Sequence, residues 1–200
     1  VWRQADRYNV PRICFANKMD RVGASYEDTI QSIITRLGAN PIAMQLPIGS
    51  EANFSGVVDL LTMQAITWDD DQGRDMVYGP IPSHLVEQAT QMRESMVESI
   101  AELDDDLTVK FLEGEEISIE ELKAALRRAV IANTATPVFC GSSLRNKGVQ
   151  PVLDAVIDYL PSPADIPPAK GHNPNNDKEV ELPVEDNAPV SALVFKIVTD

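Results

Sequence analysis

The chain has 200 residues and a mass of 21.9 kDa, enough for one or two domains. Hydrophobic residues make up 44% and charged residues 24%, so the chain can bury a core and does not belong to the disordered class. Two cysteines exclude a disulfide scaffold, no apolar run approaches the roughly 18 residues of a membrane span, and a net charge of −14 argues against the whole chain lying along nucleic acid.

The first expected unit is a strand, a loop and a helix. Residues 12–16 form a short apolar run after a proline, which favours a buried strand, and residues 17–24 follow as a loop. Ser25 and Asp28 have the spacing of a capping box, and Gly38 is the expected stop of the helix. The apolar face of this helix recurs at helical spacing and comprises Ile30, Ile33, Ile34 and Leu37.

The middle of the chain has a different pattern. Residues 57–61 and 63–68 are expected to be β segments, with turns near Gly49 and Gly56 and a polar turn over residues 69–73. Residues 83–103 predict a helix of about five or six turns. The core stripe of that helix comprises Leu85, Ala89, Met92, Met96, Ile100 and Leu103. Ser118 and Glu121 then cap another helix.

A second strand, loop and helix unit follows. Residues 136–140 favour a buried strand, residues 141–143 a tight loop, and residues 149–160 a helix. The expected apolar face of this helix comprises Val149, Val152, Leu153, Val156, Ile157 and Leu160. Residues 163–187 are rich in Pro, Asn, Asp and Glu and are expected to be a linker, and residues 190–198 begin a β-rich segment.

Both ends of the sequence are expected to be cuts through a larger structure. The chain begins at Val1 without a leader pattern, and its final β-branched run ends without a turn residue. The alternative is a short protein whose ends are held by a partner.

Acidic residues are concentrated in the middle of the chain. Residues 83–130 carry 12 acidic and 5 basic side chains. A solvated helix face is the ordinary explanation, and a docking surface for a basic partner is the functional one.

Asn17, Lys18, Met19 and Asp20 directly follow the first predicted strand and match NKxD, the guanine-reading motif of GTPases. Guanine presents two adjacent donors, N1–H and the 2-amino group, and the carboxylate of Asp20 can accept both. Adenine lacks that donor pair, so it would leave the carboxylate unpaired. Lys18 can lay its stem along the purine, and Asn17 can bridge neighbouring loops. The alternative explanation is an ordinary polar loop after a strand.

Gly141, Ser142 and Ser143 follow the second predicted strand. Backbone N–H groups of such a loop can face guanine O6, because small residues allow close approach. This tripeptide is common in turns, and it indicates a guanine contact only together with the NKxD motif upstream.

The remaining polar residues receive no catalytic or metal-binding role. Cys14 and Cys140 are expected to be buried reduced thiols, although a disulfide between neighbouring strands is conceivable. His84 and His172 have no partner at metal-ligand spacing. Residues 70–73 fit the D-x-x-G pattern of GTPases but follow NKxD, so they are expected to be a hairpin turn. No G-x-x-x-x-G-K-[ST] sequence occurs, so we expect no phosphate loop, catalytic residue or Mg²⁺ ligand in this chain.

Three stretches together resemble the bacterial elongation factor G family of translational GTPases. They are VPRICFANKMDRVGA, LPIGSEANFSGVVDLLTMQAITW and CGSSLRNKGVQPVLDAVIDYLPSP. The resemblance covers nearly the whole chain, and the family has an inserted subdomain in the long gap between its two guanine loops.

The resemblance implies an α/β fold, the C-terminal half of a P-loop GTPase domain with an inserted α+β subdomain, followed by the start of a β-barrel domain. Residues 1–41 and 133–162 would be the GTP-binding half, 42–132 the insert, 163–187 the linker and 188–200 the start of the barrel. The guanine contacts of the family fall on Asn17, Lys18, Met19, Asp20, Ser142 and Ser143, with Met19 carried by motif position only. The family commonly has Ala where Ser143 stands.

The resemblance further implies GTP or GDP as ligand and a cytoplasmic protein that moves tRNA and mRNA on the ribosome. Mg²⁺ would be needed by the parent protein. Its partners would be large-subunit RNA and the ribosomal stalk protein, which the acidic helices would meet. This piece alone is expected not to hydrolyse GTP. The alternatives are a stand-alone, non-hydrolysing ribosome- or protein-binding module, and a ribosome-protection or release-factor relative.

Overall fold

The computed structural model describes residues 1–70, 72–173, 175–188, 190–192, 194 and 196–198. They belong to two units, residues 1–160 and residues 161–200, which are described separately. The first unit contains α1 (Trp2–Arg7), β1 (Cys14–Ala16), α2 (Tyr26–Leu37), β2 (Pro41–Ala43), β3 (Gln45–Ile48), the 3-10 helix η1 (Glu51–Asn53), β4 (Gly56–Asp59), β5 (Gln64–Trp68), β6 (Met76–Gly79), η2 (Ser83–Leu85), α3 (Val86–Ala101), α4 (Asp105–Glu113), α5 (Ile119–Ile131), β7 (Thr136–Cys140), η3 (Ser143–Arg145) and α6 (Val149–Tyr159).

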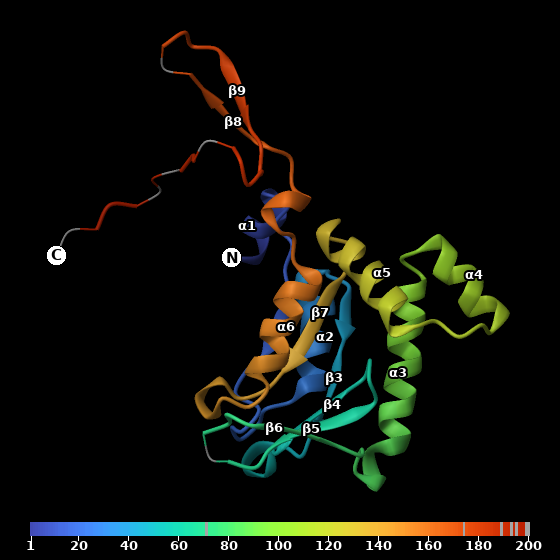
Figure 1. The fold of residues 1–200 in the computed structure, drawn as a ribbon. Coiled ribbons are helices and arrows are strands. Elements are labelled where there is room, and N and C mark those ends of the chain that lie inside the picture. The colour runs from blue at the N-terminus through green and yellow to red at the C-terminus, as the bar shows by residue number, and fades with distance from the viewer. Residues whose placement is uncertain (71, 174, 189, 193, 195, 199–200) are drawn as a thin grey trace. The chain divides into compact units, whose positions relative to one another are not determined.

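A parallel sheet of order β1-β7-β2 lies at the centre of the first unit (Figure 1). All five residues of β7 are buried, as expected for the middle strand of a parallel sheet. Ala16 of β1 is in register with Cys140 of β7, so the two strands end side by side. The two predicted strands are confirmed, and a mixed α/β fold with a parallel sheet is confirmed with them.

The caps of α2 are those that the sequence predicts. Ser25 Oγ accepts the Asp28 N–H at 3.0 Å, and Gly38 ends the helix in the left-handed region at φ 62°. The predicted apolar face is only partly correct, because Ile33 is buried whereas Ile34 and Leu37 are 44% and 42% exposed.

An antiparallel sheet of order β3-β4-β5-β6 continues from β2. Met44 connects β2 to β3, and its N–H donates to Val138 O at 3.0 Å, which ties this second sheet to β7. The connection between β3 and β4 runs over residues 49–55, between the two glycines where turns were expected, and Gly56 itself is the first residue of β4. A side chain there would place Cβ 2.2 Å from Ile66 O on the neighbouring strand. The polar turn between β5 and β6 is confirmed for its described residues.

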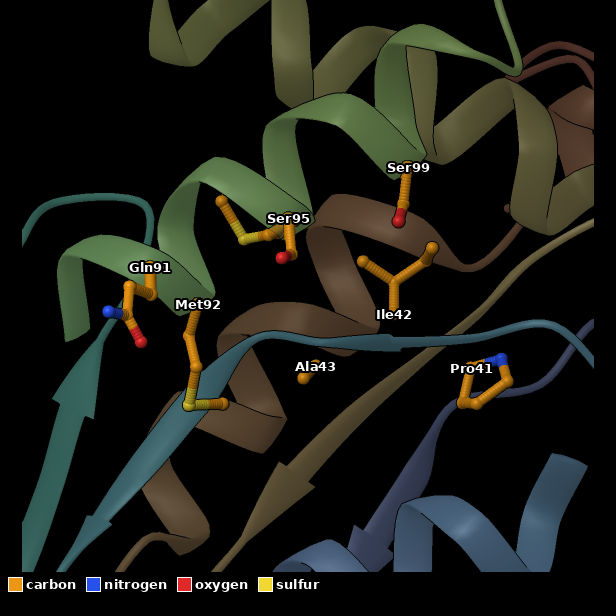
Figure 2. A pocket seen from close by; sticks show the side chains of 8 residues that line it. Pro41, Ile42, Ala43, Gln91, Met92, Ser95 and Ser99 are labelled. Carbon is orange, nitrogen blue, oxygen red and sulfur yellow. The ribbon is translucent and has the colours of Figure 1, made fainter. Parts of the chain in front are cut away.

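Three helices of the middle segment lie together beside the sheets (Figure 1). The predicted helix over 83–103 is shorter than expected: α3 has 16 residues, or about four and a half turns, after the 3-10 turn η2. Its stripe is core as predicted, with Ala89, Met96 and Ile100 buried. Figure 2 shows Met92, Ser95 and Ser99 of α3 pointing toward β2 across a groove of about 400 Å³.

Helix α4 was not predicted from the sequence, and the predicted apolar face over residues 149–160 is only partly correct. Val152 and Leu160 of that face pack against the core, whereas Leu153, Val156 and Ile157 are 60%, 41% and 77% exposed. The buried residues of α6 are Ala155 and Tyr159. The predicted cap of α5 is confirmed, since Ser118 and Glu121 form a complete reciprocal capping box.

The second unit contains η4 (Pro163–Asp165), β8 (Ala169–His172) and β9 (Glu179–Leu182). Strands β8 and β9 pair as an antiparallel hairpin, so the segment expected to be a linker contains regular structure. Lys170 Nζ and Glu179 Oε1 lie 2.8 Å apart across this hairpin. The β-rich segment expected at 190–198 falls partly outside the described residues, and its described residues are in no strand.

Candidate functional site

The two candidate loops leave neighbouring strands at the same edge of the parallel sheet. Asn17 directly follows β1 and Gly141 directly follows β7, and the last residues of these strands are in register. The Gly141 N–H donates to Ala16 O at 3.1 Å. Ligand sites of parallel α/β sheets form at the carboxyl ends of the strands, and the two loops meet there.

Asn17 connects the two loops through one side-chain oxygen. Its Oδ1 accepts the Ser143 N–H and the Ser143 hydroxyl, both at 3.0 Å, and the Lys18 N–H at 2.7 Å. The sequence suggested an amide bridge at this position, and the structure contains one. Lys18 is exposed and takes a left-handed φ of 65°, which turns the chain between Asn17 and Met19.

Met19 anchors the first loop in the hydrophobic core. Its side chain is only 3% exposed and belongs to a cluster with Tyr26 and Val138. Its N–H donates to Gly141 O at 3.0 Å. The third residue of the NKxD motif is therefore a buried residue that fixes the loop to the core.

Asp20 is the recessed carboxylate of the site. Its side chain is 9% exposed, and Oδ2 lies 3.3 Å from Arg145 Nε. The neighbouring hydroxyl of Ser142 is the main cause that holds the pKa of Asp20 below its ordinary value, and Arg145 lowers the pKa further, against the opposing effect of burial. Ser142 is fully buried, and its Oγ has no hydrogen-bond partner of full geometry among the described residues.

The second loop closes on itself. The Ser142 N–H donates to Lys147 O at 2.9 Å, and the Lys147 N–H returns to Ser142 O at 3.0 Å. Gly141 is required by close approach, because a Cβ there would lie 2.3 Å from Lys147 O and 2.8 Å from the Phe15 ring. The loop is therefore compact and fixed at its start.

Several residues that support these loops were not predicted from the sequence. Arg145 contacts Asp20, and Glu51 bonds to the first loop at two places. Gly73 O accepts Asn146 Nδ2 at 2.9 Å and Gln150 Nε2 at 2.7 Å, so the polar turn after β5 supports the second loop. None of these contacts has a local sequence signal, because each joins residues far apart in the chain.

The cysteines are free thiols. Cys14 is opposite Val138 and Cys140 is opposite Ala16, so the two cysteines are not neighbours in register. Burial raises the pKa of both thiols. Within the described ranges, no group of three or more His, Cys, Asp or Glu side chains could hold a metal ion. No helix in the described part of the chain is long and apolar enough to cross a membrane.

Known proteins resemble this chain over most or all of its length. The model of the elongation factor Tu GTP-binding domain family matches residues 1–162. Proteins named elongation factor G from Thermotoga maritima and Fervidobacterium nodosum are 54% and 52% identical over all 200 residues. The chain spans 29% of the length of each. A crystal structure of a protein from Thermus thermophilus matches 84% of this chain and 25% of that chain with a TM-score of 0.73 and 29% identity. The resemblance to elongation factor G is confirmed.

Proposed function

Because the chain belongs to the family of the elongation factor Tu GTP-binding domain, we propose that it recognises the guanine base of GTP and GDP within a translational GTPase. The observation that carries this proposal is the recessed carboxylate of Asp20 at the junction of two loops, beside the Ser142 hydroxyl and with its pKa lowered. A carboxylate that stays ionised in a recess is suited to two adjacent donors.

Each of the six predicted residues has a proposed part in base recognition. Asp20 accepts the N1–H and the 2-amino group, and Lys18 covers one face of the purine with its stem. The remaining residues hold Asp20 and Lys18 in place and position the backbone N–H groups that face guanine O6. They are Asn17, Met19, Ser142 and Ser143. Adenine nucleotides are rejected because they would leave Asp20 without its donors.

The reaction belongs to the complete protein. We propose that it hydrolyses GTP with Mg²⁺ and couples this to the movement of tRNA and mRNA on the ribosome in the cytoplasm. The phosphate loop, the Mg²⁺ ligands and the water-positioning group have no counterpart in this sequence, so the 200 residues alone are expected to be inactive.

The proposed layout assigns residues 1–41 and 133–162 to the GTP-binding half, 42–132 to an insert, 163–187 to a connecting segment and 188–200 to the start of a β-barrel. The exposed apolar side chains of α6 support it, because a further part of a GTPase domain would cover them. Leu153 and Ile157 are the most exposed of these.

A second surface is proposed to bind a partner. Three exposed acidic residues recur every four positions along α3 and at its end: Glu94, Glu98 and Glu102. Such a stripe attracts a basic surface, and we propose the ribosomal stalk protein as its occupant and large-subunit RNA as a contact of the complete protein elsewhere. A stand-alone binding module would use the same stripe without any nucleotide preference.

The test is the nucleotide selectivity of the complete gene product. Fluorescent GDP bound to the protein is displaced with GDP, inosine diphosphate and ADP, and binding is expected to weaken in that order. Inosine lacks only the 2-amino group, so its loss of affinity reports the second contact of Asp20. Equal displacement by GDP and ADP would reject guanine recognition and favour the binding-module alternative.

A further inference from the structure

We propose that Glu51 is a positioning residue that holds Asp20 in its base-reading place, an inference that rests on the proposed guanine recognition. Glu51 begins η1, in the connection between β3 and β4, and is therefore part of the antiparallel sheet region rather than of either candidate loop. It nevertheless bonds to the first candidate loop on both sides of Asp20.

Two hydrogen bonds of Glu51 enclose the base-reading residue. The Glu51 N–H donates to Met19 O at 3.1 Å, immediately before Asp20. The Gly23 N–H donates to Glu51 Oε1 at 2.8 Å, three residues after Asp20. Backbone and side chain of one residue therefore hold the two ends of the short segment that carries the carboxylate.

Besides the contact of the Asp20 carboxylate with Arg145, two further bonds of this segment are local turns. Arg21 N–H donates to Lys18 O and Ala24 N–H donates to Arg21 O, at 3.0 and 3.1 Å. Local turns shape a loop but do not place it relative to the rest of the molecule. The Met19 N–H fixes one point on Gly141 O, and Glu51 adds the bond that fixes the far side at Gly23.

The backbone of Glu51 is held in an unusual conformation. Its φ is 52°, in the left-handed region that residues other than glycine rarely adopt. The bend beside it has room for glycine only, because a Cβ on Gly49 would lie 2.1 Å from Asn53 O. Conformations of this kind persist where the surroundings enforce them and are concentrated at functional positions. Here the bend aims both the N–H and the carboxylate of Glu51 at one loop.

The experiment compares two conservative variants of the complete gene product. Glu51→Asp keeps the charge and tolerates the left-handed backbone, but it is one methylene too short to reach Gly23. Glu51→Gln loses the charge but keeps the length and an oxygen that can accept the Gly23 N–H. The dissociation constants of GDP and inosine diphosphate are measured for both variants and for the unchanged protein, and thermal unfolding checks that all three are folded.

Glu51→Asp is expected to weaken GDP binding about tenfold, the scale of one lost charge-assisted bond. It should weaken the binding of inosine diphosphate less, so that the ratio of the affinities for GDP and inosine diphosphate falls toward one. Glu51→Gln should keep most of that preference. A merely structural role would weaken both nucleotides equally and leave the ratio unchanged.

The two proposals fail in different ways. If the unchanged protein does not prefer GDP to inosine diphosphate, guanine recognition itself is wrong. If the unchanged protein has the preference and Glu51→Asp retains it, the positioning role of Glu51 is overturned. Should Glu51→Asp unfold, amide exchange of Gly23 in the unchanged protein decides: protection of this amide supports its bond to Glu51, and exchange as fast as that of a free amide overturns the positioning role.

Discussion

Asp20→Asn is the substitution that tests the chemistry of the site most directly. The carboxylate is 9% exposed, so a base bound to it would be largely shielded from competing water. Hydrogen bonds to charged groups contribute about 1.5–3 kcal/mol each. The asparagine keeps one acceptor, loses the charge and turns a donor toward the 2-amino group. The expected cost for GDP is about 3 kcal/mol, or roughly a hundredfold weaker binding.

Xanthine supplies the complementary measurement. Its 2-oxo group replaces the 2-amino group, so it can accept from the asparagine amide while N1–H still donates to the asparagine oxygen. Affinities of GDP, xanthosine diphosphate and ADP are measured by displacement of fluorescent nucleotide from the complete gene product and from its Asp20→Asn variant. The variant is expected to bind xanthosine diphosphate more tightly and GDP more weakly than the unchanged protein does. An equal change for both nucleotides would refute a direct contact between Asp20 and the base.

Three further predictions concern the loops, the acid stability and the acidic stripe. Gly141→Ala forces a Cβ to within 2.3 Å of a backbone oxygen, so urea unfolding should show a loss of about 2 kcal/mol, whereas Gly79→Ala, which meets nothing within 4 Å, should be nearly neutral. The Lys110 ammonium, helped by Ser118, lowers the pKa of Glu121 from 4.5 to about 2. Because the folded-state pKa is depressed, this contribution to stability is complete above about pH 4.5 and is lost as the pH falls toward 2, and Glu121→Gln should remove that pH dependence. Reversing the charge of Glu94, Glu98 and Glu102 together should weaken stalk-protein binding at low salt. An unchanged affinity at low salt would exclude an electrostatic docking surface.

Elements with local signals were predictable from the sequence. Strand β7 has a proline near its start, an apolar run after it and a glycine directly beyond its end, and α2 and α5 begin at serines with an acid three residues later. These signals depend on neighbouring residues only, and the backbone groups that they satisfy are present wherever the helix finally packs. A similar signal marked α4 and was overlooked: Asp104 accepts the Leu107 N–H, and Gly114 ends the helix.

The buried face of α6 was not predictable from spacing. The helix is apolar on most of its circumference, so residues at helical spacing define more than one possible stripe. The structure buries Ala155 and Tyr159 and exposes Leu153 and Ile157. Which stripe faces inward depends on α5 and the sheets, whose arrangement is a long-range property. The hairpin β8–β9 was overlooked for a related reason, because a Pro- and Asn-rich composition is common to loops and to short exposed strands.

The candidate site was predictable in its loops and not in its supports. Asn17 and Ser143 are joined by a contact that spans 126 positions, and the sequence placed both in loops after strands that a parallel sheet could bring together. The supports lie in the residues between the loops, with Glu51 on the first and Gly73 on the second. Glu51 belongs to the 3-10 helix before β4, and Gly73 to the turn after β5. Their contacts with the loops depend on how the antiparallel sheet packs beside β7, which local sequence patterns do not determine.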